Sequence, residues 1–119
     1  MGLTYVDGGV GWSSVSLVVK ADMLNGFKTI HGGILFAMAD SAFAYACNSR
    51  NSKAVAQQAS ISFLAPAHEG ETLTAIAKEV SIQGRTGVYN VTITNEAAQV
   101  LASFQGLSRT IPGHIIEEE

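Results

Sequence analysis

The stretch from Thr29 to Asn48 reads TIHGGILFAMADSAFAYACN, and the rest of the chain is organised around it. From Gly33 to Cys47 nearly every residue is apolar or small, proline is absent, and alanine, leucine and methionine are good helix formers. The segment is also much longer than an ordinary strand. Apolar residues occupy every face of the helix that this pattern predicts, so we expect a buried helix with other elements packed around it.

Two features of this predicted helix point to chemistry. Asp40 is a lone carboxylate within the apolar run, and a buried carboxylate needs hydrogen-bond partners or a cavity to face. At the start of the helix, His31, Gly32 and Gly33 leave backbone N–H groups accessible to a ligand at the positive end of the helix dipole. A polarising helix end and a carboxylate are therefore expected on one element.

The composition bounds the class of protein. At 119 residues the chain is one domain, which we expect to span residues 1–111 and to be followed by an acidic tail over residues 112–119. Charged residues make up 14% of the chain, against about 25% in typical domains, so they are too few to cover the surface of a monomer. The net charge of −3, without a basic cluster, argues against a nucleic-acid partner.

Three sequence features indicate where in the cell we expect the protein. The longest apolar run is too short for a membrane span and is interrupted by Asp40. The first residues have neither the basic nor the apolar region of a signal peptide. Cys47 is the only cysteine, so no internal disulfide forms, and we expect a cytoplasmic protein in which Cys47 is a small core residue.

Six further segments show the alternation and turn boundaries of β-strands: residues 3–10, 12–20, 55–64, 72–82, 85–94 and 99–109. One face of these strands is apolar and suits the helix. The other face is rich in serine, threonine, glutamine and asparagine, which fits either a solvated face or an uncharged contact between subunits. The pattern predicts an α+β fold in which a curved antiparallel β-sheet wraps around one long central helix.

The motifs are similar to those of one enzyme family. HGG at residues 31–33 with MADSAFAYACN at 38–48 resembles the signature of the hotdog-fold acyl-CoA thioesterases, most closely those of phenylacetate degradation. Four other segments also resemble this family: MLNG at 23–26, ISFLAP at 61–66, GRTGVY at 84–89 and SFQG at 103–106. The resemblance covers nearly the whole chain and implies the hotdog fold.

The resemblance implies a role for each catalytic candidate. Asp40 attacks the thioester carbonyl or activates the water that does so, and these alternatives remain open. The Gly32 N–H stabilises the developing oxyanion. Asn25 orients the thioester or the water, although Asn-Gly is also a common turn dipeptide. His31 either caps the helix or helps to hold the carbonyl and Asn25 in place.

Each functional role has a simpler structural alternative. Asp40 can be hydrogen-bonded to Ser41 or to a backbone N–H, and glycines can serve close packing. For substrate binding we expect Gly33 and Ser41 to line the pocket and Arg85 to contact coenzyme A phosphates. Five aromatic residues are expected mostly in the core, with Phe43 or Tyr45 as candidates for the acyl pocket: Trp12, Phe36, Phe43, Tyr45 and Phe63.

The resemblance thus implies an acyl-CoA thioesterase that hydrolyses (hydroxy)phenylacetyl-CoA or related aryl thioesters, without a cofactor or metal. In this family the site is assembled from both subunits of a homodimer, and tetramers are common, so we expect a homotetramer. A thioesterase of broad or medium-chain specificity and a non-catalytic acyl-CoA-binding protein remain as alternatives.

Overall fold

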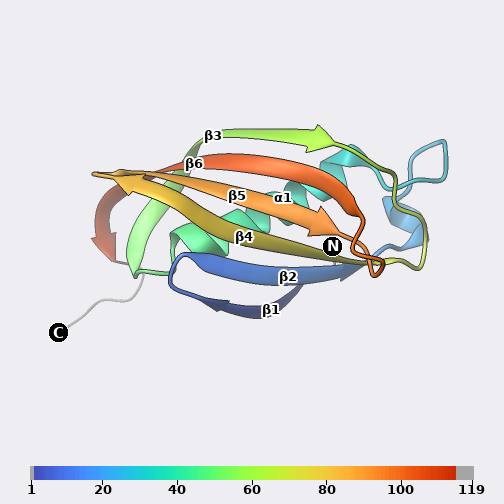
Figure 1. Cartoon of the computed structure of the whole chain (residues 1–119), viewed down its shortest axis with the longest axis horizontal. Helices are drawn as coiled ribbons and strands as arrows, with labels where there is room; N and C mark the ends of the chain where they lie inside the picture. The colour runs from blue at the N-terminus through green and yellow to red at the C-terminus, as the bar shows by residue number, and fades with distance from the viewer. Residues whose placement is uncertain (1, 115–119) are drawn as a thin grey trace.

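A computed structural model describes residues 2–114 of the chain as one long helix and a six-stranded antiparallel sheet (Figure 1). In chain order the elements are β1 (Thr4–Gly9), β2 (Trp12–Val18), the short 3-10 helix η1 (Ala21–Met23), α1 (Gly32–Cys47), β3 (Ser52–Phe63), β4 (Thr72–Gln83), β5 (Thr86–Thr94) and β6 (Val100–His114). The strand order in the sheet is β1-β2-β4-β5-β6-β3. The predicted helix, the six predicted strands and the hotdog arrangement are confirmed.

Strand β6 is longer than the sequence pattern predicts. It continues to His114, which pairs with Ser52 at the start of β3. The first three residues of the predicted acidic tail therefore belong to the sheet, and residues 115–119 lie outside the described part of the chain.

The sheet curves over α1, and the core lies between them (Figure 1). Every second residue is buried along β5 and in the first half of β4, and the register sets Ala75 opposite Ile93 and Ala77 opposite Val91. Small residues on one strand thus face larger ones on the next, which packs one apolar layer against the helix. The buried residues of α1 are Leu35, Met38, Ala39, Ala42, Phe43 and Ala46.

Helix α1 is buried on one side only. Its opposite face includes Phe36, Ala44 and Tyr45, which are exposed, and Asp40, which is half-buried. The prediction that other elements surround the helix is met on one side by the sheet of this chain. A single curved sheet covers one side of a helix. On the other side Phe36 still packs against Phe104 and Tyr45 against Tyr5, but their rings remain partly exposed, and Ala44 is exposed as well.

The aromatic residues follow the same division. Of the five expected mostly in the core, only Phe43 is buried. The other four are 37–55% exposed: Trp12, Phe36, Tyr45 and Phe63. Tyr45 packs against Tyr5 of β1, with ring centroids 4.8 Å apart, and Phe63 ends β3 beside Gly32 at the start of α1. Alternation along a strand identifies the inner face but does not tell how far the helix extends beneath it.

The two edges of the sheet are β1 and β3. Within residues 2–114, β3 pairs only with β6, so its other edge is open along a 12-residue strand. An open edge of that length is a site for pairing with another chain. Among the helices in these residues, none combines the length and apolar character that crossing a membrane requires.

Candidate active site

The loop that leads into α1 is organised by Asn25. Its Oδ1 accepts hydrogen bonds from Phe27 N at 2.9 Å, Thr29 N at 3.3 Å and Thr29 Oγ1 at 3.2 Å. The backbone closes the same turn, with Asn25 N donating to Thr29 O at 2.8 Å. Asn25 is thus a turn residue, which is the structural role that the Asn-Gly dipeptide predicts. Its Nδ2 donates to no acceptor within residues 2–114, so this N–H₂ group remains available to a ligand.

His31 is the N-cap of α1. Its backbone is extended, with φ −68° and ψ 135°, and its Nδ1 accepts a hydrogen bond from Gly33 N at 3.0 Å. Because Nδ1 accepts, the proton of the neutral imidazole is on Nε2. The capping role expected as one alternative for His31 is what the geometry provides. The Gly33 N–H is engaged in this bond and is not open to a substrate.

Gly32, the first residue of α1, has a backbone N–H that the His31 cap leaves unbonded. It donates to no acceptor in the described part of the chain, and it lies at the positive end of the helix dipole. A Cβ at this position would lie 3.0 Å from Cζ of Phe63, so glycine lets the ring lie across the start of the helix. The N–H is therefore suited to stabilise an anionic oxygen, in the manner of an oxyanion hole.

A cleft of about 400 Å³ opens beside Gly32 and Asn25. Its walls are tied together by backbone bonds, because Ile30 N donates to Ala67 O at 2.8 Å and Leu64 N donates to Leu101 O at 2.8 Å. The cleft is lined by Asn25, Thr29, Ile30, Gly32, Leu35, Phe63, Leu64, Ala65 and Pro66. The residues that follow β3 were not expected in the site, because only long-range strand pairing brings them beside the start of α1.

Asp40 lies in the middle of α1, half-buried and on the open side. Its carboxylate accepts no hydrogen bond from residues 2–114. The structural alternative, a hydrogen bond from Ser41, is wrong, because Ser41 Oγ donates to Ala37 O at 2.8 Å instead. Asp40 does not line the cleft. Gly32 and Asp40 are eight residues apart, or about 12 Å along the helix axis, whereas reacting groups must approach within about 3.5 Å.

The remaining substrate-binding candidates lie elsewhere. Ser41 lines a second hollow of about 530 Å³ on the open face of α1, with Leu3, Ala44, Tyr45 and Asn48. Arg85 is at the β4–β5 turn and lines a third pocket, of about 250 Å³, beside Cys47 and Tyr89. One chain therefore brings Gly32 and Asn25 together in one cleft but leaves Asp40, Ser41 and Arg85 outside it.

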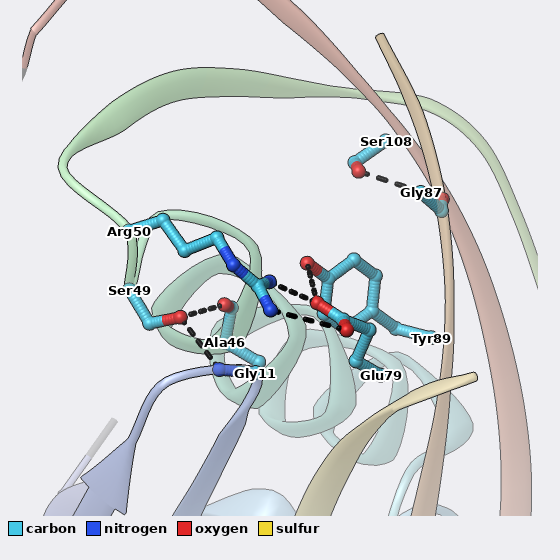
Figure 2. Close-up of polar contacts among 8 residues, drawn as sticks. All are labelled: Gly11, Ala46, Ser49, Arg50, Glu79, Gly87, Tyr89 and Ser108. Atoms are coloured by element: carbon cyan, nitrogen blue, oxygen red, sulfur yellow. Dashed lines mark hydrogen bonds and ion pairs between the residues drawn. The ribbon is translucent and has the colours of Figure 1, made fainter. Parts of the chain in front are cut away.

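The pocket beside Arg85 adjoins a polar cluster at the C-terminal end of α1 (Figure 2). Arg50 forms an ion pair with Glu79 of β4, and Tyr89 Oη donates to the same carboxylate at 3.4 Å. Burial, together with Glu79, raises the pKa of Tyr89 to about 12. Burial also raises the pKa of the Cys47 thiol to about 11. Neither group is ionised near neutral pH, so neither is suited to act as a base or nucleophile there.

A long helix wrapped by a curved antiparallel sheet is the hotdog fold, and here its first N–H is unpaired and a carboxylate lies in its middle. The chain belongs to the thioesterase superfamily, whose family model matches residues 27–102. It is 45% identical to the acyl-coenzyme A thioesterase PaaI of Escherichia coli strain K12, over 99% of this chain and 84% of that protein. The family and this similarity identify a thioester hydrolase.

Solved structures agree. The structure of E. coli PaaI, a protein from the phenylacetic acid degradation operon, matches with a TM-score of 0.93 and 43% identity, covering 95% of this chain and 82% of that one. A variant of the phenylacetic acid degradation protein PaaI of Thermus thermophilus matches with a TM-score of 0.89 and 36% identity, covering 92% of this chain and 94% of that one. A Streptococcus mutans UA159 protein bound to acetyl CoA matches with a TM-score of 0.91 and 26% identity, covering 96% of this chain and 92% of that one.

Proposed function

We propose that this enzyme hydrolyses the thioester of (hydroxy)phenylacetyl-CoA or a related aryl-CoA to the free acid and coenzyme A, as a step in phenylacetate degradation. The similarity to E. coli PaaI, an acyl-coenzyme A thioesterase from the phenylacetic acid degradation operon, supports the substrate class. The acetyl CoA bound to the Streptococcus mutans relative supports a coenzyme A thioester as the ligand of this fold. The single cysteine accords with a reducing, cytoplasmic setting.

One observation carries the mechanism: the open N–H of Gly32 and the carboxylate of Asp40 are too far apart on one helix to act on one carbonyl. Both lie outside the core, Asp40 on the open side of α1 and Gly32 at its start, beside the cleft. Two copies related by a twofold axis would place Asp40 of one copy opposite Gly32 of the other. We infer a homodimer with two equivalent sites, each formed by residues from both copies.

In this arrangement the thioester carbonyl oxygen accepts a hydrogen bond from the Gly32 N–H, which stabilises the negative charge that forms on attack. Asp40 of the other copy either attacks the carbonyl carbon, giving an anhydride that water then hydrolyses, or removes a proton from the attacking water. Either route breaks the C–S bond and releases the coenzyme A thiol. Asn25 Nδ2 donates to the carbonyl or to the water, and His31 holds the start of α1 in place.

The open surfaces of the chain fit this assembly. The open face of α1 and the unpaired edge of β3 are the apolar and hydrogen-bonding surfaces that a second copy would cover. The outer face of the sheet is uncharged over much of its area, with Ser62, Asn90 and Thr92 exposed there. We propose that dimers pair through this outer face into a homotetramer. Arg85 is a candidate for coenzyme A phosphates, and Gly33 and Ser41 are candidates to border the shared site.

Subunit complementation tests the shared site. Asp40→Ala removes the carboxylate, and Gly32→Pro removes the N–H. Proline suits this first helical position, because His31 before it is already extended and the nearest atoms to an added Cβ belong to the outer end of the half-exposed Phe63 side chain. Each variant alone should be inactive. After unfolding and refolding the two together, we expect about a quarter of the wild-type activity, from heterodimers with one intact site.

The control is each variant refolded alone, which should stay inactive. Mixtures that also stay inactive, although heterodimers are shown to form, would assign both residues to a site within one copy and overturn the shared arrangement. The substrate class is tested by thiol release from phenylacetyl-, hydroxyphenylacetyl-, benzoyl- and straight-chain acyl-CoA. Equal or greater rates with straight chains would contradict the aryl preference, and binding without hydrolysis would indicate a non-catalytic acyl-CoA-binding protein.

A further inference from the structure

The loop beside the cleft carries an aromatic side chain in an unusual setting. Phe27 is 90% exposed, the highest fraction among the exposed large hydrophobic residues within residues 2–114. Lys28 follows it, also exposed and without an ion pair among these residues. Isolated exposed apolar residues are common on protein surfaces, so exposure alone assigns no role to Phe27.

The backbone that carries Phe27 is held by specific hydrogen bonds. Phe27 N donates to Asn25 Oδ1 at 2.9 Å, and Lys28 N donates to Asn25 O at 3.1 Å. Lys28 has a φ of 62°, a left-handed conformation that side chains other than glycine and asparagine rarely adopt. The strained backbone at Lys28 is offset by the surrounding bonds, and such strain concentrates at ligand-binding loops.

The position of the loop relative to the cleft suggests what it binds. Asn25 and Thr29, on either side of Phe27 and Lys28, both line the cleft that contains Gly32. In Figure 1 the loop, in cyan, extends beyond the start of α1 at one end of the molecule. A coenzyme A thioester with its carbonyl at Gly32 must leave the cleft through its pantetheine arm, which ends in an adenine ring and three phosphates. An exposed aromatic residue and an exposed cation, consecutive on the loop between two residues that line the cleft, match that group.

We propose that Phe27 and Lys28 form the binding subsite for the nucleotide of coenzyme A: the adenine ring stacks on Phe27, and a phosphate pairs with Lys28. This inference rests on the proposed function, because it assigns the part of the acyl-CoA that does not react. Stacking needs an exposed ring, and Phe27 offers one from a backbone that the Asn25 turn holds. The lysine supplies charge on a chain whose net charge of −3 would otherwise repel a polyanion.

The test compares two thioesters of one acyl group, phenylacetyl-CoA and phenylacetyl-N-acetylcysteamine, which lacks the nucleotide. Phe27→Ala should lower kcat/KM for the coenzyme A ester about tenfold and leave that for the short ester unchanged. Phe27→Trp should keep the wild-type value for both. Lys28→Gln should also lower kcat/KM for the coenzyme A ester only, by an amount that shrinks as salt is raised. Val10→Ala is the matched control, since Val10 is 65% exposed in the turn near the other end of α1.

Calorimetric binding of adenosine 3′,5′-bisphosphate separates this proposal from the reaction itself. We expect wild-type protein to bind it and Phe27→Ala to bind it about tenfold more weakly. If neither thioester is hydrolysed but the bisphosphate binding still depends on Phe27, the proposed function fails and the subsite stands. Equal loss with both thioesters, unchanged bisphosphate binding, or dissociation of Phe27→Ala into monomers would overturn the subsite, the last by making Phe27 a subunit contact.

Discussion

At the scale of single residues, the Asn25 side chain has two roles, and a single substitution can separate them. Its Oδ1 accepts three hydrogen bonds that build the turn, while its Nδ2 has no acceptor in the described part of the chain. An aspartate at this position would keep the accepting oxygen and lose the donating N–H₂ group. The two roles can therefore be measured independently.

We expect Asn25→Asp to keep a melting temperature close to that of the wild type and to lower kcat about 100-fold, because a donor to the reacting group is lost. Asn25→Ala should lower both kcat and the melting temperature, since it also removes the acceptor of the turn. Thermal unfolding and thiol release measure the two effects. An Asn25→Asp enzyme with full activity would reduce Asn25 to a turn residue.

Gly106 is a second residue whose lack of a side chain matters. A Cβ there would lie 2.8 Å from three ring atoms of Phe43, the one aromatic residue of α1 that is fully buried. We expect Gly106→Ala to lower the free energy of unfolding by about 1–3 kcal/mol through overpacking, as measured by urea denaturation. Gly26→Ala is the control, because nothing lies within 4 Å of its added Cβ. Combining Gly106→Ala with Phe43→Leu should recover part of the loss.

At the scale of elements, the C-terminal end of α1 is anchored to three parts of the sheet (Figure 2). Ser49 Oγ donates to Ala46 O at 2.7 Å and accepts from Gly11 N at 2.8 Å, which ties the helix end to the β1–β2 turn. Arg50 reaches Glu79 on β4, whose carboxylate also accepts from Tyr89 on β5. Side chains thus anchor this end of the helix, whereas backbone hydrogen bonds of Ile30 and His31 hold its start beside the cleft.

Alkaline pH should release this anchor. The pKa of Tyr89 rises from 10.0 to about 12, through burial first and Glu79 second. Because the folded-state pKa is higher than the unfolded one, the stability that neutral Tyr89 contributes is fully present below about pH 10 and is lost as pH rises toward 12. We expect the free energy of unfolding to fall across this window, and to fall less in Tyr89→Phe. Spectrophotometric titration should show a tyrosine that ionises near pH 12 and is missing from Tyr89→Phe.

The same elements show what the sequence can predict. The long apolar run and the two-residue alternation are local patterns, and they predicted α1 and all six strands. The cleft was not predictable in the same way, because Phe63 and Pro66 reach Gly32 only through the pairing of β3 with β6. Apolar residues on all faces of α1 predicted a helix surrounded by other elements, and the sheet of one chain covers one side of it. The pattern cannot distinguish a core position from a surface that a second copy covers.

At the scale of the whole molecule, the open face of α1 and the outer face of the sheet make separate predictions. Ala44→Arg adds a charge at an exposed position in the middle of the open face. It should cost the isolated chain little, since arginine is a good helix former, but it should block a second copy. We expect monomers by sedimentation and no thiol release.

Thr92→Arg, on the exposed outer face of β5, is the matched variant. We expect it to reduce tetramers to dimers that keep their activity, because the outer face contributes no residue to the proposed site. A dimeric and active Ala44→Arg enzyme would show that the open face of α1 is not the subunit contact. If Thr92→Arg instead gave monomers, the outer face of the sheet would be the dimer contact, and the open face of α1 would be the contact between dimers.

The separation of Gly32 from Asp40 along one helix also has a consequence for how the enzyme behaves on dilution. A ligand that touches both copies binds the pair and not the single chain, so by mass action it must strengthen the association of the two chains. Substrate and product would then hold the enzyme together, and specific activity would fall with enzyme concentration unless coenzyme A or its thioesters are present. Catalysis would in that case be switched on by the arrival of the compound it consumes.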